Sequence, residues 1–243
     1  MRSLPSLRLS SETADATPVL SLRGVSKSFP GVRALHNVGL TLRAGEVTAL
    51  VGENGAGKST LVKILTGIYP PDEGEILVSG RPLTCNGPRD AWAAGIVAIH
   101  QETVMFDELS VAENIFMGHM PLAGGGRVDW AEMKARTSEL LKRLEADFEA
   151  GDLLKTLSVA RKHLVEIARA LSHEARIIIM DEPTSALSAR EIGDLFAIIE
   201  QLKEQGHAVL FISHKFEEIF QIADRWTCLR DGVEVGAGAI SEI

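Results

Sequence analysis

The sequence predicts an α/β protein built on a largely parallel sheet, because short apolar segments alternate with amphipathic ones. Residues Val47–Val51 have the composition of a strand that is buried on both faces. A glycine-rich loop follows at 52–57, and apolar side chains at helical spacing predict a helix over Ser59–Gly67. A strand, a glycine loop and a helix in this order open a parallel α/β unit.

The other elements are predicted in chain order. Residues 1–18 are expected to form a flexible tail, and 19–243 the folded unit. Strands are expected from Val19, from Ala34, and at Ile96–His100, Arg176–Met180 and Ala208–Ile212. Helices are expected at Ser158–Ser172, Ala189–Glu204 and Phe216–Ala223, before a final hairpin. The helix-rich segment at about 102–157 is predicted to be an inserted helical subdomain.

Composition narrows the class of protein. The 243 residues carry a net charge of −8, and only 5% are aromatic, which argues against nucleic-acid binding and against a polybasic membrane anchor. No apolar run approaches the ~18 residues of a membrane span, and no secretory signal is recognised. Any membrane role would be that of a peripheral subunit. Cys85 and Cys228 are expected to be small buried side chains rather than a disulfide framework.

The segment Gly52-Glu-Asn-Gly-Ala-Gly-Lys58-Ser59 matches the phosphate-loop pattern. Backbone N–H groups of such a loop surround phosphate oxygens, and the following helix start favours an anion. Lys58 would reach the β and γ phosphates of ATP, and Ser59 would bind Mg²⁺. A chance match on a surface turn is the alternative, but this one lies between a buried strand and an amphipathic helix. The predicted nucleotide-binding residues are Gly52, Glu53, Asn54, Gly55, Ala56, Gly57, Lys58, Ser59 and Thr60.

Two carboxylates follow the apolar strand that ends at Met180. Ligands of parallel sheets lie beyond the carboxyl ends of the strands, so Asp181 is expected beside the phosphate loop as a Mg²⁺ ligand. Glu182 is expected to act as the general base toward the attacking water. The alternative is that Asp-Glu-Pro only starts a turn.

Five further features occur in a fixed order around these motifs. They are Phe29 in Ser26-Lys-Ser-Phe29-Pro, Gln101 after the strand at Ile96–His100, Leu157-Ser158-Val-Ala-Arg161, Ser185-Ala-Leu187-Ser188 and His214. With them, nearly the whole chain from Val19 resembles the ATP-binding cassettes of the ABC transporter family. The resemblance implies a P-loop NTPase with a RecA-like core, an antiparallel β subdomain and an inserted α-helical subdomain.

The resemblance also implies a role for each residue. Phe29 would stack on adenine, Gln101 would contact Mg²⁺ and act in catalysis, and His214 would contact the γ phosphate. Ser158 would cap a helix whose positive end faces the ATP of a second cassette, and the 185–188 loop would lie across that interface. Each has an ordinary alternative when taken alone: a core aromatic, a solvated glutamine, a structural histidine and a simple helix cap.

One segment departs from the family pattern. The usual signature continues from Leu-Ser with Gly-Gly-Gln, whereas this chain has Val159, Ala160 and Arg161. Val159-Ala160 resembles a variant found in sugar-importer ATPases, and Arg161 is less usual. The departure bears on how this chain acts on the opposite ATP, and not on its own phosphate loop.

The segments His100–Asn114 and Lys162–Arg169 resemble monosaccharide-importer ATPases, most closely rhamnose-type ones. The implied protein is an ATP-hydrolysing subunit at the cytoplasmic face of the inner membrane. Its implied partners are a second cassette, membrane permease subunits and, indirectly, a periplasmic sugar-binding protein, with no nucleic acid.

Two other classes of protein stay open. A soluble ABC ATPase of the translation-factor or DNA-repair type would be expected to carry a basic linker, coiled coils or zinc cysteines. The other class is an unrelated phosphate-loop GTPase or kinase, but the sequence has no Asn-Lys-x-Asp guanine motif, and such a protein would leave the signature helix unexplained. Importers of this group usually carry two cassettes in one polypeptide, so the chain is either an N-terminal half or a short protein.

Overall fold

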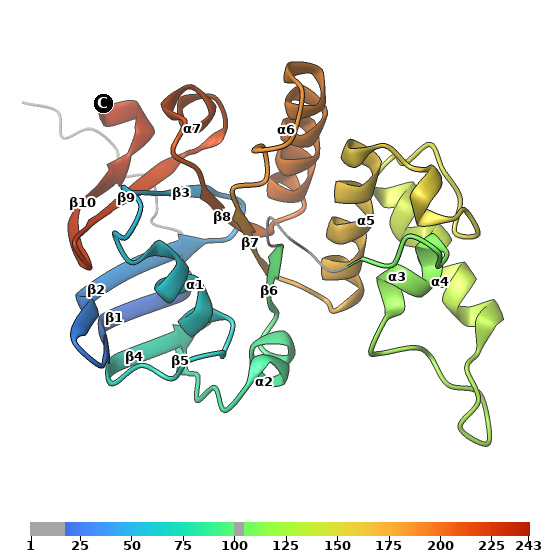
Figure 1. The fold of residues 1–243 in the computed structure, drawn as a ribbon, viewed down its shortest axis with the longest axis horizontal. Coiled ribbons are helices and arrows are strands. Elements are labelled where there is room, and N and C mark those ends of the chain that lie inside the picture. Colours follow the sequence, from blue (N-terminus) through green and yellow to red (C-terminus); the bar gives the residue numbers. More distant parts are fainter. Residues whose placement is uncertain (1–17, 100–104) are drawn as a thin grey trace, which may run out of the picture.

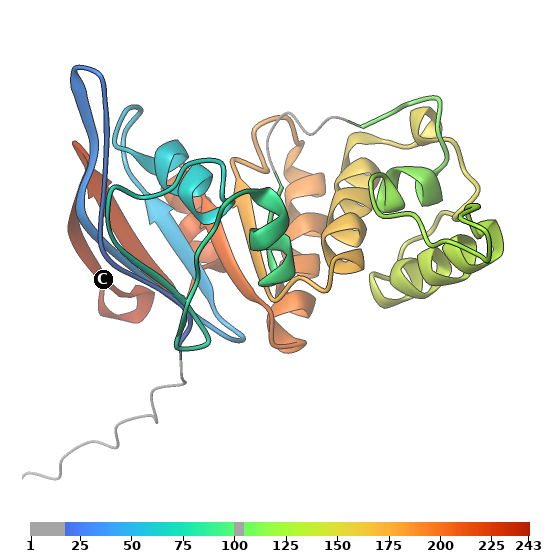
Figure 2. The same ribbon diagram turned by 90° about the horizontal axis from the view of Figure 1, so that it is seen from below.

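The structure, a computed structural model, describes residues 18–99 and 105–243. The two sheets lie together toward one end of the long axis of the molecule, and a group of helices lies at the other end (Figure 1 and Figure 2). The first sheet has four strands in the order β2-β1-β4-β5, all paired antiparallel. Its strands are β1 (Pro18–Phe29), β2 (Val32–Arg43), β4 (Glu73–Val78) and β5 (Arg81–Pro82).

The second sheet has six strands in the order β10-β9-β3-β8-β7-β6. All its neighbours are parallel except β9 and β10, which form the expected final hairpin. Its strands are β3 (Val47–Val51), β6 (Ile96–Ile99), β7 (Ile177–Asp181), β8 (Ala208–Ile212), β9 (Arg225–Arg230) and β10 (Val233–Ala239). All five residues of β8 are buried, as expected of a strand covered on both faces.

This parallel sheet separates two apolar cores. Leu50 of β3 belongs to the core shared with the antiparallel sheet and with α1 (Lys58–Leu65). Val47 of the same strand belongs to the core shared with α5 (Val159–Ser172) and α6 (Ala189–Glu204). The strand ends that carry the candidate site are therefore anchored from both sides.

A helical region lies beyond the edge strand β6 (Figure 1). It contains α3 (Val111–Phe116), α4 (Trp130–Arg143) and a 3₁₀ turn at Leu154–Thr156, and both α3 and α4 contact α5. Two further helices, α2 (Pro88–Ala93) and α7 (Phe216–Ile222), and a 3₁₀ turn at Ile240–Glu242 complete the fold. None of the helices within the described residues is both long enough and apolar enough to span a membrane.

The predicted elements occur close to their expected positions, with three corrections. The first helix ends at Leu65 instead of Gly67, because Gly67 takes a left-handed φ of 73°. Pro18, which the sequence places in the flexible tail, is the first residue of β1. The two thiols, Cys85 and Cys228, are half-buried rather than fully buried. Residues 1–17 and His100 lie outside the described residues.

Candidate nucleotide-binding site

The loop between β3 and α1 forms one wall of a pocket of about 390 Å³. The opposite wall comes from the end of β7 and the start of β2. The pocket is thus built from three segments that are far apart in the sequence. The residues that line it are Val32, Ala34, Glu53, Asn54, Gly55, Gly57, Lys58, Ser59, Thr60, Asp181 and Glu182.

Two glycines of the loop cannot be replaced without a clash. A Cβ atom on Gly52 would lie 2.4 Å from the carbonyl oxygen of Leu229, and one on Gly57 would lie 2.8 Å from that of Ala34. Gly57, with a φ of 104°, is the N-cap of α1. No side chain caps this helix, and its first turn contains no acidic residue. Its free N–H groups therefore form a positive end that suits a phosphate.

The side chain of Lys58, the first residue of α1, folds back onto the loop that precedes the helix. Its Nζ donates hydrogen bonds to the carbonyl oxygens of Gly52, at 2.6 Å, and of Glu53, at 3.0 Å. The residue is only 9% exposed. An ammonium group has three N–H donors, so one is left for a phosphate oxygen. The loop, the helix end and the lysine together fit the polyphosphate of a nucleotide.

The acidic pair lies at the carboxyl end of a parallel strand, where ligands of such sheets bind. Asp181 is the last residue of β7, and Glu182 follows it with a left-handed φ of 49°. The carboxylate Oε1 of Glu182 lies 3.3 Å from Nδ1 of His214, which follows the neighbouring strand β8. Asp181 and Ser59 line the same pocket, and carboxylate and hydroxyl oxygens are ligands that suit Mg²⁺.

Some expected residues do not line this pocket. Phe29 packs edge-on against Tyr69, with ring centroids 5.2 Å apart, while Val32 and Ala34 of the next strand line the wall. Sequence reasoning missed these two, because an exposed valine at a strand start carries no motif. Ala56, at 4% exposed, belongs to the apolar core instead of the pocket. Gln101 lies outside the described residues.

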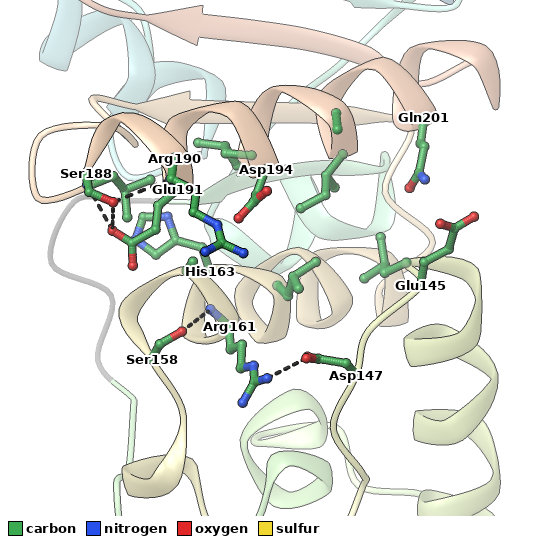
Figure 3. Close-up of a pocket in the computed structure, with 17 residues that line it drawn as sticks. Glu145, Asp147, Ser158, Arg161, His163, Ser188, Arg190, Glu191, Asp194 and Gln201 are labelled. Carbon is green, nitrogen blue, oxygen red and sulfur yellow. Dashed lines mark hydrogen bonds and ion pairs between the residues drawn. The ribbon is translucent and has the colours of Figure 1, made fainter.

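Ser158 lies in a different place, at the start of α5 (Figure 3). It lines a groove of about 740 Å³ between α5 and α6, and its hydroxyl accepts a hydrogen bond from the Arg161 backbone N–H at 3.4 Å. Leu187 and Ser188, from the loop that precedes α6, line the same groove. Both ribbon views place α5 well away from α1, so Ser158 does not belong to the phosphate pocket of its own chain.

A glycine loop that feeds an uncapped helix, a lysine folded into that loop and an acidic pair at a strand end together define a phosphate-loop nucleotide-binding protein. A comparison with protein families identifies which kind of phosphate-loop protein this is. The profile of the ABC transporter family matches residues 35–185, a range that contains the loop, the start of α5 and the acidic pair. The chain belongs to the ABC transporter family.

Curated relatives are similar over nearly the whole chain. The ribose import ATP-binding protein RbsA 2 of Rhizobium johnstonii is 59% identical over 232 residues, which are 96% of this chain and 45% of the relative. The ribose import ATP-binding protein RbsA of Roseobacter denitrificans is 60% identical over 226 residues, 93% of this chain and 44% of the relative. The chain thus spans less than half the length of these relatives.

Solved structures have the same fold. A nucleotide-free ATP-binding cassette from an ABC transporter is 27% identical, with a TM-score of 0.81 and 91% of each chain covered. An ATP-binding cassette of an ABC transporter in its ADP conformation is 26% identical, with a TM-score of 0.82, over 93% of this chain and 94% of the other. The predicted fold class is therefore confirmed: an α/β P-loop fold of the ABC type.

Proposed function

We propose that this chain is an ATP-hydrolysing cassette that energises the import of a monosaccharide. The observation that carries the proposal is one pocket that holds both the phosphate loop and the acidic pair of Asp181 and Glu182. The curated relatives are named as ribose import ATP-binding proteins, which supports the substrate class. A soluble ABC ATPase without a permease is the second candidate.

The predicted site residues have separable roles in this proposal. The N–H groups at the start of α1 and the free donor of Lys58 hold the β and γ phosphates. Bound Mg²⁺, held by Ser59 and Asp181 and in the family pattern by Gln101, would neutralise charge that develops on the phosphates. Glu182 accepts a proton from the attacking water, and His214, hydrogen-bonded to it, contacts the γ phosphate. Phe29 would contact adenine from the end of β1.

A second cassette completes the site in this proposal. Ser158, at the start of α5, is exposed and lines the groove between α5 and α6 instead of the pocket of this chain's own phosphate loop. The N–H groups at the start of α5 can act on a nucleotide only if another cassette presents one. The 185–188 loop lines the same groove and would lie across the same interface.

The remaining partners follow from the proposed role in import. Permease subunits would receive the motion of the two cassettes at the cytoplasmic face of the membrane, and a periplasmic binding protein would select the sugar. Ribose is favoured by the names of the relatives. The finer expectation of a rhamnose-type importer stays a prediction.

The test is a Mg²⁺-dependent ATPase assay of the intact protein, combined with purification of the protein together with the partner proteins that it binds. We expect ATP turnover and retention of a sugar permease. ATP turnover with ribosome association and no permease would support the soluble class instead. Absence of both ATP binding and turnover would contradict the assignment of the pocket.

A further inference from the structure

A buried carboxylate lies behind the candidate catalytic pair. Glu218 is the third residue of the short helix α7, and its side chain is only 8% exposed. Its Oε2 accepts hydrogen bonds from the hydroxyl of Thr184 at 2.7 Å and from that of Ser213 at 3.1 Å. Its Oε1 accepts one from Nζ of Lys215 at 2.9 Å. One carboxylate thus accepts hydrogen bonds from the loop that follows β7 and from the loop that follows β8.

The two hydroxyls flank the catalytic candidates in the sequence. Thr184 comes two residues after Glu182, and Ser213 comes immediately before His214. Both hydroxyl residues are buried, at 2% and 3% exposed. The Ser213 hydroxyl also accepts the backbone N–H of Lys215 at 3.1 Å, which fixes the loop on the far side of His214. A shift of either hydroxyl would therefore move a catalytic side chain.

The other side-chain contacts between the two loops are longer: Glu182 Oε1 lies 3.3 Å from His214 Nδ1, and Lys215 Nζ lies 3.5 Å from Thr184 Oγ1. The Glu182 N–H still bonds to the Ile212 carbonyl oxygen at 3.0 Å, but its left-handed φ of 49° is strained and needs support from its surroundings. The side chain of His214 is 62% exposed, so packing restrains it little. The carboxylate of Glu218 adds a buried contact that joins both loops.

We propose that Glu218 is a positioning residue, whose buried carboxylate sets the separation between Glu182 and His214 by tying Thr184 to Ser213. The inference rests on the proposed function, because it assigns the purpose of this spacing to ATP hydrolysis. A buried carboxylate is costly unless it is hydrogen-bonded and paired. Here the hydroxyls of Thr184 and Ser213 donate to Oε2, and the Lys215 ammonium pairs with Oε1, so both oxygens of the buried carboxylate are satisfied.

The test is a set of matched variants of the intact protein. Thr184→Val removes one hydroxyl and keeps the shape of the side chain, while Thr184→Ser keeps the hydroxyl. Glu218→Gln removes the charge, and Glu217→Gln removes the neighbouring, exposed carboxylate as a control. ATP turnover gives kcat and KM, and hydrogen exchange reports on the backbone amides of Glu182, Thr184 and Ser185 and of residues 213–216.

We expect Thr184→Val and Glu218→Gln to lower kcat about tenfold, the size of one lost hydrogen bond, with KM for ATP within about twofold. Amide exchange should become faster in both loops and not in β9 or β10. Thr184→Ser should restore kcat and slow exchange, and Glu217→Gln should resemble the wild type. A purely structural role would lower the free energy of unfolding without this selective loss of kcat.

Two outcomes would overturn the inference. The first is an unchanged kcat in Thr184→Val together with unchanged exchange in the loops. The second is an equal loss in Glu217→Gln. If the wild type itself does not hydrolyse ATP, the proposed function fails, and the assignment of Glu218 to that function fails with it. The exchange data would then show separately whether Glu218 ties the two loops together.

Discussion

The guanidinium of Arg161 pairs with the carboxylate of Asp147, which joins the first turn of α5 to the segment that follows α4 (Figure 3). A cation at a helix start opposes the helix dipole, and the carboxylate offsets that effect. The side chains of Arg161 and Asp147 are 42% and 66% exposed, so water screens the pair. The unusual residue of the signature is therefore engaged within its own chain.

We expect this pair to show coupling in a double-mutant cycle. Asp147→Ala should lower the free energy of unfolding by up to ~1 kcal/mol, as for other exposed ion pairs. In an Arg161→Gln background, the same change should have no measurable effect, because the partner is gone. Urea unfolding of the four proteins gives the coupling energy. An equal effect of Asp147→Ala in both backgrounds would show that the pair contributes nothing.

The second prediction concerns Glu182. Replacement by Gln keeps the size of the side chain and removes its basicity, so ATP turnover should fall by about 10²-fold or more. ATP binding should persist, because the phosphate loop is untouched. Turnover within a few fold of wild type would exclude Glu182 as the base.

The same variant tests for a second cassette. With ATP and without Mg²⁺, the Glu182→Gln protein should elute as a dimer during size-exclusion chromatography, and the dimer should disappear without ATP. A monomer that still binds ATP would mean that this chain does not pair with itself and that a different cassette is its partner.

The third prediction separates two lysines of α1. Lys58→Ala should weaken ATP binding, because the Nζ that is held at 2.6 Å from the Gly52 carbonyl oxygen can no longer donate to a phosphate. Lys63→Ala is the matched control, since Lys63 is exposed on the same helix and lies over the ring of Tyr69. Titration with a fluorescent ATP analogue measures both. Equal affinities for the two variants would contradict the assignment of the loop.

The fourth prediction is a loss of stability in mild acid. Burial, the adjacent His119 and the charge of Arg169 lower the pKa of His173 to about 4 from its usual 6.5. The unfolded chain therefore takes up a proton as the pH falls from 6.5 to about 4, and the folded chain does not. The neutral, buried His173 therefore contributes its full share to the free energy of unfolding above pH 6.5, and this share is lost progressively as the pH falls to about 4.

The check is urea unfolding at about pH 7.5 and about pH 5. His173→Phe keeps an aromatic ring between Trp92 and His119, which both contact His173, and it removes the titrating group. We expect a smaller fall in stability with pH in this variant than in the wild type. His36→Gln, on the exposed face of β2, is the control and should behave as the wild type does. If the free energy of unfolding of His173→Phe falls between the two pH values as much as that of the wild type, His173 is not the cause of the acid sensitivity.

Local sequence was enough to predict the strands and helices around the site. The first four residues of Val47–Val51 and of the strand that ends at Asp181 are buried, and all of them except Thr48 are apolar, because both faces of the sheet are covered. Ser158 predicts the start of α5, and its role as the N-cap is confirmed by the hydrogen bond that its hydroxyl accepts from the Arg161 backbone N–H. Helix ends were less predictable, because Gly67 stops α1 through a backbone conformation that leaves no periodic pattern.

Contacts between distant segments were not predictable from local patterns. Nothing in the sequence shows that Phe29 contacts Tyr69 or that Val32 and Ala34 reach the pocket, since these contacts depend on how the sheets pack. The burial of Glu218 is of the same kind. Its exposed neighbour Glu217 has the same chemistry, so only the position of α7 distinguishes them.

The strand order also bears on how the chain folds. The phosphate loop follows β3, His214 follows β8 and Glu182 follows β7, and these strands are consecutive in the sheet. Pairing between them joins segments of high sequence separation, so such contacts form late and slowly. A half-folded chain would then have a glycine loop but no pocket. Nucleotide would bind only the finished core, and its concentration in the cell would raise the population of folded protein by mass action.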